Sequence, residues 1–326
     1  MYVLSNLQFL AQVSCDSGRR RRAVSVTQPT LTSRHCRTCR SRRPPSVWQS
    51  QPKFRCQMQR ARQAQASAER SDDYKCAEDL VGKFVQSNGV VGLGTGVLVN
   101  AVIDCLAKKT SAGLLQNVRC IPASDVSASE AAFQGVTVSS LAEHPAVDVV
   151  FEEVDEIVLQ DPELPFIAGR LAAPVQPNLI RMRELLAASK CNVMLVDGID
   201  QVAAKLRGVL PVVVDADLWE DAGEALDDIF IPDAEIWRRS RAGYDPADPR
   251  AVDSPYLSAQ GHNLLDVKFY GPLKLFGEQA SYQKIAEEIE SLDGVIAHGL
   301  FVNVASTAAV FTNEGVDLIQ SAAFVP

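Results

Sequence analysis

The first 70 residues of this 326-residue chain are almost without acidic side chains, because only Asp16 and Glu69 interrupt them. The same stretch holds 14 lysines and arginines against those two acids, a local charge of +12. It also lacks an apolar periodicity that could build a core, and it is rich in serine, threonine and glutamine. This composition predicts an organelle transit peptide over residues 1–70, with a basic nucleic-acid-binding arm as the alternative.

Long apolar runs are missing as well. No stretch reaches the roughly 20 apolar residues that span a bilayer, and no short apolar segment precedes a small-residue cleavage site. From residue 71 onward, acidic residues outnumber basic ones by 38 to 18. Because nucleic-acid backbones require a basic surface, we expect neither DNA nor RNA as a partner of this part, and no membrane.

Cysteine pairs at metal-binding spacing are scarce. Cys36-x-x-Cys39, within the predicted transit peptide, resembles half of a zinc site, but no second pair follows at a suitable spacing. The later cysteines have no such spacing and are expected to be small core residues: Cys76, Cys105, Cys120 and Cys191. The sequence therefore predicts no metal site.

A glycine-rich turn lies between a short β-branched run and an apolar helical pattern, at residues 90–106. Glycines let a backbone approach an anion, and the helix start behind them presents unpaired N–H groups. Gly94, Thr95 and Gly96 are therefore candidate phosphate-binding residues, and a plain structural turn is an equal alternative. The turn is not the dinucleotide fingerprint, because Val97 stands where the third glycine is required.

Strands and helices alternate after this turn. Strands are expected at residues 118–123, 136–138, 146–151 and 192–196, with one helix that starts at residue 127 and another over 179–189. Such alternation predicts an α/β fold with a doubly wound parallel sheet, in which ligands bind beyond the carboxyl ends of the strands. The glycine turn and the acidic run at residues 152–156 both follow strands, so they should lie at one edge of the sheet.

Two further features concern boundaries. Ser127 and Glu130 stand at capping-box spacing, which predicts that a helix begins at Ser127. From about residue 208 the pattern changes to antiparallel α+β, and an apolar strand at 308–311 then returns to the first sheet. We therefore predict a second, smaller α+β domain over 208–301, and a main α/β domain made of 71–207 and 302–326.

The order of these motifs carries a family resemblance. The matching segments are residues 91–96, 124–127, 155–156, 210–214, 261–267 and 294–301. In this order and spacing the chain resembles the ribose-5-phosphate isomerase A family over nearly all of residues 72–324. The resemblance implies a small sugar-phosphate substrate, no metal or organic cofactor, and a homodimer or higher homo-oligomer.

That resemblance also implies a reaction. The family interconverts ribose 5-phosphate and ribulose 5-phosphate, in the pentose phosphate pathway or in carbon fixation, by moving a proton between the first two carbons of the open-chain sugar. A carboxylate takes and returns the proton, while a lysine and nearby acids hold the oxygens. Together with the predicted transit peptide, this chemistry implies the chloroplast stroma.

Site residues are carried over from the family by position. Glu152 and Asp155 take the places of two acids that bind hydroxyls or assist ring opening, and Glu156 follows them. Lys75 falls close to a phosphate-contacting lysine of the family, although an exposed helix lysine is at least as good an interpretation.

Several positions depart from the family pattern. Val97 and Leu98 replace two hydroxyl side chains of the phosphate loop, Glu153 replaces a glycine, Ala168 replaces the lysine, and Asp200 replaces a cation. The change at Glu153 adds bulk and negative charge to a site for an anionic sugar, and each of the other changes removes a donor or a positive charge from it.

The catalytic base is also displaced. Counting back without gaps from Asp197 puts Met182 in its place, whereas a two-residue deletion would bring Glu184 there instead. The sequence thus leaves two hypotheses. One is a weak isomerase with an eroded site that uses Glu184, Glu152 and Asp155. The other is a pseudoenzyme that acts as a sugar-phosphate-binding, regulatory or assembly subunit.

Overall fold

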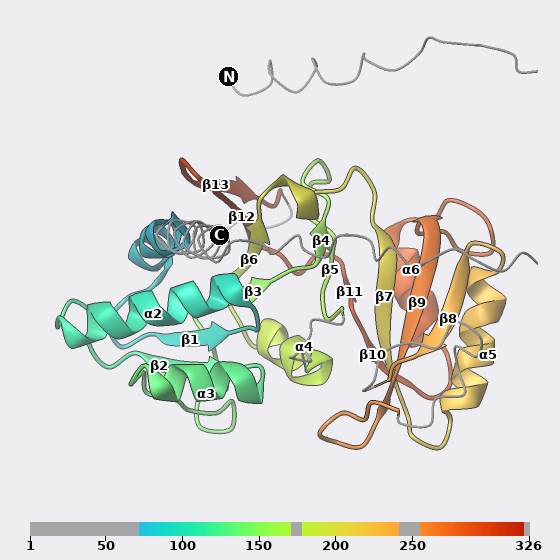
Figure 1. Ribbon diagram of the computed structural model, residues 1–326, viewed down its shortest axis with the longest axis horizontal. Helices are drawn as coiled ribbons and strands as arrows, with labels where there is room; N and C mark the ends of the chain where they lie inside the picture. The colour runs from blue at the N-terminus through green and yellow to red at the C-terminus, as the bar shows by residue number, and fades with distance from the viewer. Residues whose placement is uncertain (1–71, 171–177, 241–254, 323–326) are drawn as a thin grey trace, which may run out of the picture. The chain divides into compact units, whose positions relative to one another are not determined.

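The computed structural model describes residues 72–170, 178–240 and 255–322 (Figure 1). The predicted transit peptide over residues 1–70 lies outside them. Six strands form the largest sheet, in the order β13-β12-β6-β3-β1-β2. Five of them pair in parallel, and β13 returns antiparallel at one edge. The strands are β1 (Val90–Leu93), β2 (Arg119–Pro122), β3 (Val149–Glu153), β6 (Asn192–Asp197), β12 (Thr307–Thr312) and β13 (Gly315–Gln320). The predicted parallel α/β sheet is confirmed.

Helices cover both faces of this sheet. α2 (Val97–Ser111) and a helix over 72–84 pack on one face, and α4 (Leu179–Ala187) packs on the other. Neighbouring residues of β3 divide between the two faces, since Phe151 lies in the core with α2 and Val150 in the core with α4. Burial on both faces explains why the strands read as nearly continuous apolar runs.

The strand expected at 136–138 is only an isolated bridge between Val138 and Cys120, and two element boundaries also differ from the expectation. β3 begins at Val149 and includes Glu152 and Glu153, because its ladder to β6 continues as far as these residues. α3 (Asp125–Phe133) begins earlier than expected, because Ser124 and not Ser127 is its N-cap. Ser124 Oγ accepts the N–H of Ser127, and Ser127 Oγ accepts the N–H of Ser124. The predicted capping box of Ser127 with Glu130 is therefore wrong.

A four-stranded antiparallel sheet follows, in the order β10-β7-β9-β8. Its strands are β7 (Arg207–Val214), β8 (Ala234–Arg238), β9 (Asn263–Pro272) and β10 (Val295–His298), and its helices are α5 (Trp219–Phe230) and α6 (Tyr282–Glu290). Val212 lies in the core with α5 and α6, whereas its neighbour Val213 lies in the core with α4. One face of the small sheet therefore packs toward the main sheet's helix α4.

Short strands join the two sheets. β4 (Glu156–Ile157), β5 (Phe166–Ile167) and β11 (Leu300–Phe301) form a three-stranded sheet. The expected single strand over 294–301 is divided at Gly299 between β10 and β11. At Gly299 the backbone passes so close to Ala168 that a Cβ would lie 2.2 Å from its carbonyl oxygen. Only glycine fits such an approach, so the strand changes direction there.

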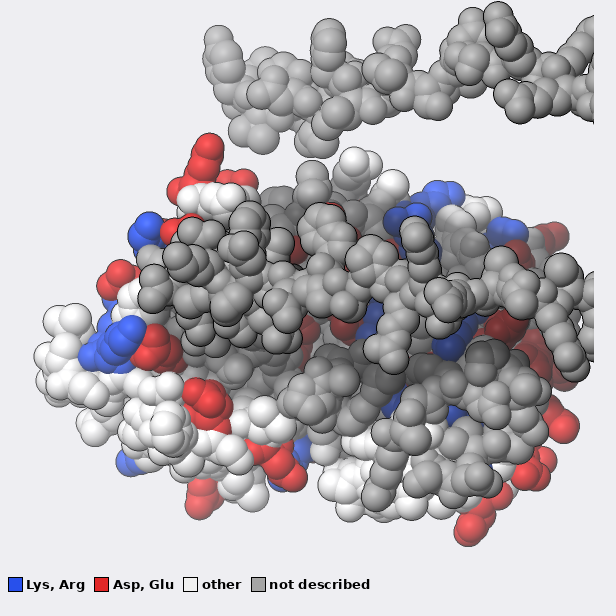
Figure 2. Space-filling view, viewed as in Figure 1, with Lys and Arg blue, Asp and Glu red and all other residues white. Residues whose placement is uncertain are grey.

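The surface carries charges of both signs. On the face drawn in Figure 2, acidic atoms gather along the right-hand edge, over α5, whose sequence WEDAGEALDDIF includes five acids. Cys76, Cys105 and Cys120 are buried and Cys191 is partly buried, all as free thiols. Among the described residues, no helix has the length and apolar character that a membrane span requires.

Candidate functional site

The glycine turn and the acidic run meet at one edge of the main sheet. β1 and β3 are parallel neighbours with Leu93 opposite Phe151, so the residues that follow them lie side by side. The N–H of Gly94 donates to the carbonyl of Phe151 at 2.8 Å. A Cβ at position 94 would lie 2.4 Å from the Glu152 carboxyl group, so this approach requires glycine. The predicted shared edge is confirmed.

Glu152 is fully buried beneath the turn. Its Oε1 accepts the N–H of Thr95 at 3.0 Å, while its Oε2 has no hydrogen-bond partner among the described residues. Burial raises the pKa of Glu152 to about 8, and the nearby Glu153 and Asp155 carboxylates raise it further. The hydrogen bond from the Thr95 N–H acts in the opposite direction and lowers it. Glu152 is therefore mostly a neutral acid at pH 7.

Glu153 reaches the start of α2. Its Oε2 accepts the N–H of Leu98 at 2.7 Å. Gly96 is the N-cap residue of α2, with a φ of 153° that favours glycine. Burial raises the pKa of Glu153 to about 7, and Asp197 and Asp155 also raise it. The N-terminus of α2 is thus capped by a side chain from β3.

Asp155 and Glu156 have different partners. Asp155 Oδ2 accepts the backbone N–H of Arg170 at 2.8 Å, and burial raises the pKa of Asp155 although Arg170 lowers it. Glu156 is 6% exposed and forms an ion pair with the Arg170 guanidinium at 2.5 Å. It also accepts the N–H of Arg207 at 3.0 Å. Glu156 is therefore engaged where β4 meets β7, and its carboxyl oxygens are turned to these partners.

α4 places the two candidate base positions in different surroundings. Met182 is 1% exposed and lies in the same apolar core as Ala168. Glu184 is exposed and lines two cavities, of 610 and 290 Å³, beside α4. Neither lining includes the glycine turn, Glu152 or Asp155. The structure thus brings Glu152 and Asp155 to the edge with the turn, whereas the two cavities that Glu184 lines include neither acid.

The two remaining charged positions lie on the surface. Lys75 sits on the helix over 72–84, where its ammonium group is 3.1 Å from Asp72 and its side chain is 70% exposed. Asp200 is exposed in the short 3-10 helix Ile199–Gln201. In the described ranges, Lys75 forms no ion pair with the glycine turn, and its pairing with Asp72 is the one expected of an exposed helix lysine.

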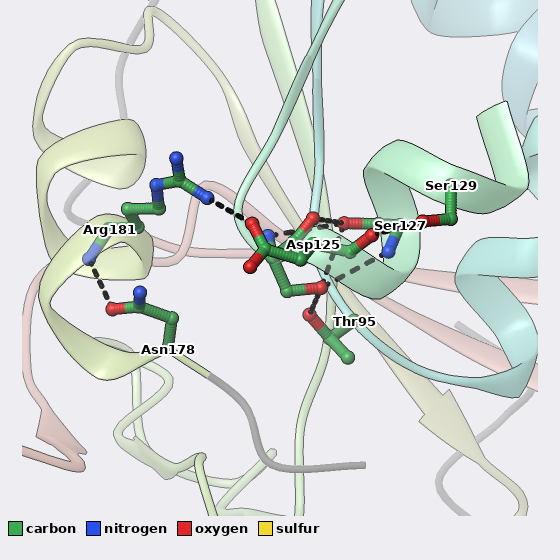
Figure 3. A network of polar contacts seen from close by, with 7 residues as sticks. Thr95, Asp125, Ser127, Ser129, Asn178 and Arg181 are labelled. Carbon is green, nitrogen blue, oxygen red and sulfur yellow. Dashed lines mark hydrogen bonds and ion pairs between the residues drawn. The ribbon is translucent and has the colours of Figure 1, made fainter. Parts of the chain in front are cut away.

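Sequence reasoning missed a hydroxyl network behind the turn (Figure 3). Thr95 Oγ1 donates to Ser124 Oγ at 2.8 Å, and Ser124 Oγ also contacts Ser127 Oγ at 3.0 Å. Arg181, at the start of α4, forms an ion pair with Asp125 at 3.0 Å. The Thr95 hydroxyl is therefore bound to the cap of α3. The Ser-x-x-Ser spacing from Ser124 is the sequence signal that could have revealed this cap.

The chemistry available at this edge is that of carboxyl groups and hydroxyls. Two acids titrate near neutrality, Thr95 and Leu98 donate their N–H groups to those acids, and Ala168 supplies no charge. In the parts of the chain that the structure describes, no group of three or more His, Cys, Asp or Glu side chains could hold a metal ion. The arrangement can bind hydroxyl groups and exchange protons with them.

Comparisons with known proteins agree on one family. The family model described as ribose 5-phosphate isomerase A (phosphoriboisomerase A) matches residues 119–315. Ribose-5-phosphate isomerase A of Gloeobacter violaceus is 30% identical over 74% of this chain and 93% of its own length. A probable ribose-5-phosphate isomerase 3, chloroplastic, of Arabidopsis thaliana is 29% identical over 78% of this chain and 86% of its own length.

A solved structure shares the fold. It is a D-ribose-5-phosphate isomerase in complex with phospho-erythronic acid, and it superposes with a TM-score of 0.63. It is 25% identical to this chain, and the match covers 77% of this chain and 98% of the solved one. Sequence and fold therefore point to the same relatives.

Proposed function

Because this chain belongs to the ribose 5-phosphate isomerase A family, we propose that it interconverts ribose 5-phosphate and ribulose 5-phosphate only weakly, with an eroded site at the edge beside Gly94 and Glu152. One observation carries the proposal. Of the two positions that the family resemblance leaves open for the base, Met182 is buried in one apolar core with Ala168, which stands in place of the lysine, and Glu184 is exposed beside α4. Losing a general base typically costs about 10²- to 10⁴-fold in rate, and losing charge stabilisation costs a comparable factor.

Glu152 and Asp155 are the residues that we propose for contact with substrate hydroxyls. Both lie at the carboxyl edge of the sheet, and the pKa of each is raised by burial. A protonated carboxyl can donate a hydrogen bond to a ring or carbonyl oxygen, which supports ring opening. Ala168 stands where the family has a lysine, so that position offers no cation to a developing oxyanion, and we expect proton transfer at carbon to be the slow step.

The test is steady-state turnover of ribose 5-phosphate by the purified chain and by its Glu184→Gln variant, beside the Gloeobacter violaceus relative. We expect the wild-type rate to be at least about 10²-fold below the relative. The Gln variant should retain the wild-type rate within about twofold, because Glu184 faces other cavities. Turnover at the relative's level would reject the eroded site, and loss of residual turnover in the variant would identify Glu184 as the base.

A non-catalytic role is the second candidate. The engagement of the Thr95 and Leu98 N–H groups by Glu152 and Glu153 favours it, because the turn then has fewer free donors for a substrate phosphate. We propose a homodimer or higher homo-oligomer in either case, which light scattering on the purified chain would test. A monomer at micromolar concentration would reject this assembly.

We also propose that the mature protein resides in the chloroplast stroma. The +12 segment at residues 1–70 and the chloroplastic Arabidopsis thaliana relative support this location. N-terminal sequencing of the protein from its native tissue should find a mature end near residue 70. An abundant form that starts at Met1 would reject the processing step.

A further inference from the structure

The anion-binding features of the glycine turn are present but already engaged. α2 has 15 residues and no acid in its own first turn, so its N-terminal N–H groups and its dipole favour a negative group from elsewhere. Glu153 supplies that group, with Oε2 at 2.7 Å from the N–H nitrogen of Leu98. A phosphate oxygen bound to this N–H would have to take the position of that carboxyl oxygen.

The fold holds Glu153 in this position. It is the last residue of β3, and its backbone lies in the ladder opposite Leu195 of β6. A Cβ added to Gly96 would lie 2.2 to 2.8 Å from three atoms of the Glu153 side chain. The space that glycine leaves open at the start of α2 is therefore filled by Glu153, and a phosphate group would find it occupied.

The surroundings of Glu153 are acidic and apolar. Asp197, Asp155 and Asp73 are close enough that each raises the pKa of Glu153, in addition to the effect of burial. Val97, the first residue of α2, is 68% exposed. Within the described residues, Glu153 has no ion pair with a lysine, arginine or histidine. A phosphate placed here would add its charge to a group of carboxylates, which repel it.

We propose that Glu153 determines ligand specificity at this edge: it fills the anion site from within, so that the edge accepts a hydroxyl-rich ligand without a phosphate group, of the class of a free aldopentose. The inference rests on the proposed function only in placing the ligand at this edge. Sugar hydroxyls both donate and accept hydrogen bonds, so they can pair with carboxyl groups in either protonation state.

The first test measures binding of inorganic phosphate by isothermal titration calorimetry at pH 8. Wild type is compared with Glu153→Gly and Glu153→Ala, which both vacate the start of α2, and with Glu220→Gln as a matched control. Glu220 lies in the first turn of α5, so the control removes the same charge beside a different helix N-terminus. We expect phosphate to bind either variant at least about tenfold more tightly than wild type or control.

Equal phosphate affinity in wild type and in a folded Gly or Ala variant would overturn the proposal. The second test needs no variant, because it compares ribose with ribose 5-phosphate on the wild-type chain. We expect affinities within about threefold of each other, and a preference for the phosphorylated sugar of tenfold or more would overturn the proposal. Both tests report binding alone, so their failure is separate from a failure of the weak-turnover proposal.

Discussion

Between pH 6.5 and 8.5, the free energy of unfolding is expected to fall by roughly 1–2 kcal/mol per pH unit. Glu152 and Glu153 cause this slope, because their folded-state pKa values are raised to about 8 and about 7. In the unfolded chain both acids are ionised throughout this window, whereas the folded chain still binds protons. Their contribution to stability is therefore fully present below about pH 4.5 and is lost as the pH rises through the folded-state values.

Urea unfolding at several pH values would measure this slope in wild type and in Glu152→Gln and Glu153→Gln. Each variant should remove its own part of the slope, and the double variant should be nearly flat between pH 6.5 and 7.5, because the buried thiols, whose pKa values are also raised, add a slope only at higher pH. The slope is the informative quantity, because a glutamine amide at 152 replaces an oxygen that has no partner and can change stability at every pH. A wild-type slope that persists in the double variant would contradict the assignment.

The protonation of His298 in the unfolded chain sets the lower pH limit for measuring the effect of the two glutamates. Burial lowers its pKa to about 3, so the folded chain keeps it neutral while the unfolded chain protonates it near pH 6.5. Its contribution to stability is thus lost as the pH falls below about 6.5, opposite in sign to that of the two glutamates. Measurements above pH 6.5 separate the two effects.

Replacing Arg239 by methionine is expected to destabilise the protein by about 3–5 kcal/mol. Arg239 and Asp266 are both fully buried, with Nε 2.8 Å from Oδ2 and Nη2 2.5 Å from Oδ1. Nη2 also donates to the carbonyl of Gly169 at 3.1 Å, which ties the segment after β5 to the small sheet. Removing the arginine leaves the Asp266 carboxyl group buried without its bidentate partner.

The matched control for this variant is the double replacement Arg239→Met with Asp266→Leu. Because it removes both charges together, it should recover much of the lost stability, as measured by urea unfolding at pH 7. The account is contradicted if the double variant is less stable than Arg239→Met alone, or if the single variant unfolds like wild type. Either result would show that an unpaired Asp266 is not the cause of the destabilisation.

The sheet could be predicted because its signals are local and repeated. The apolar strand at 192–196, the glycine turn at 94–96 and the return strand near Ala308 each follow from patterns of a few residues. Their parallel order follows from the alternation of strands and helices. The edge where Gly94 meets Glu152 could likewise be predicted, because parallel strands end on the same side.

The contacts within the site could not be predicted in the same way. Position 153 is occupied by a bulky acid in the sequence, but only the register of β3 against β1 brings its carboxyl group to the N-terminus of α2. The burial of Arg239 against Asp266 depends on the pairing of β8 with β9, across 27 residues of chain. Charged residues are rarely fully buried, so local patterns assign them to the surface.

The central claim is that proton transfer at carbon is impaired at this edge. Exchange of the C2 proton of ribose 5-phosphate in deuterium oxide, followed by NMR, tests it most directly, because exchange reports the transfer even when little product accumulates. With Met182 and Ala168 in the apolar core, we predict that the C2 proton is retained over a period in which the Gloeobacter violaceus relative exchanges it completely. Exchange by this chain at the relative's rate would contradict the account.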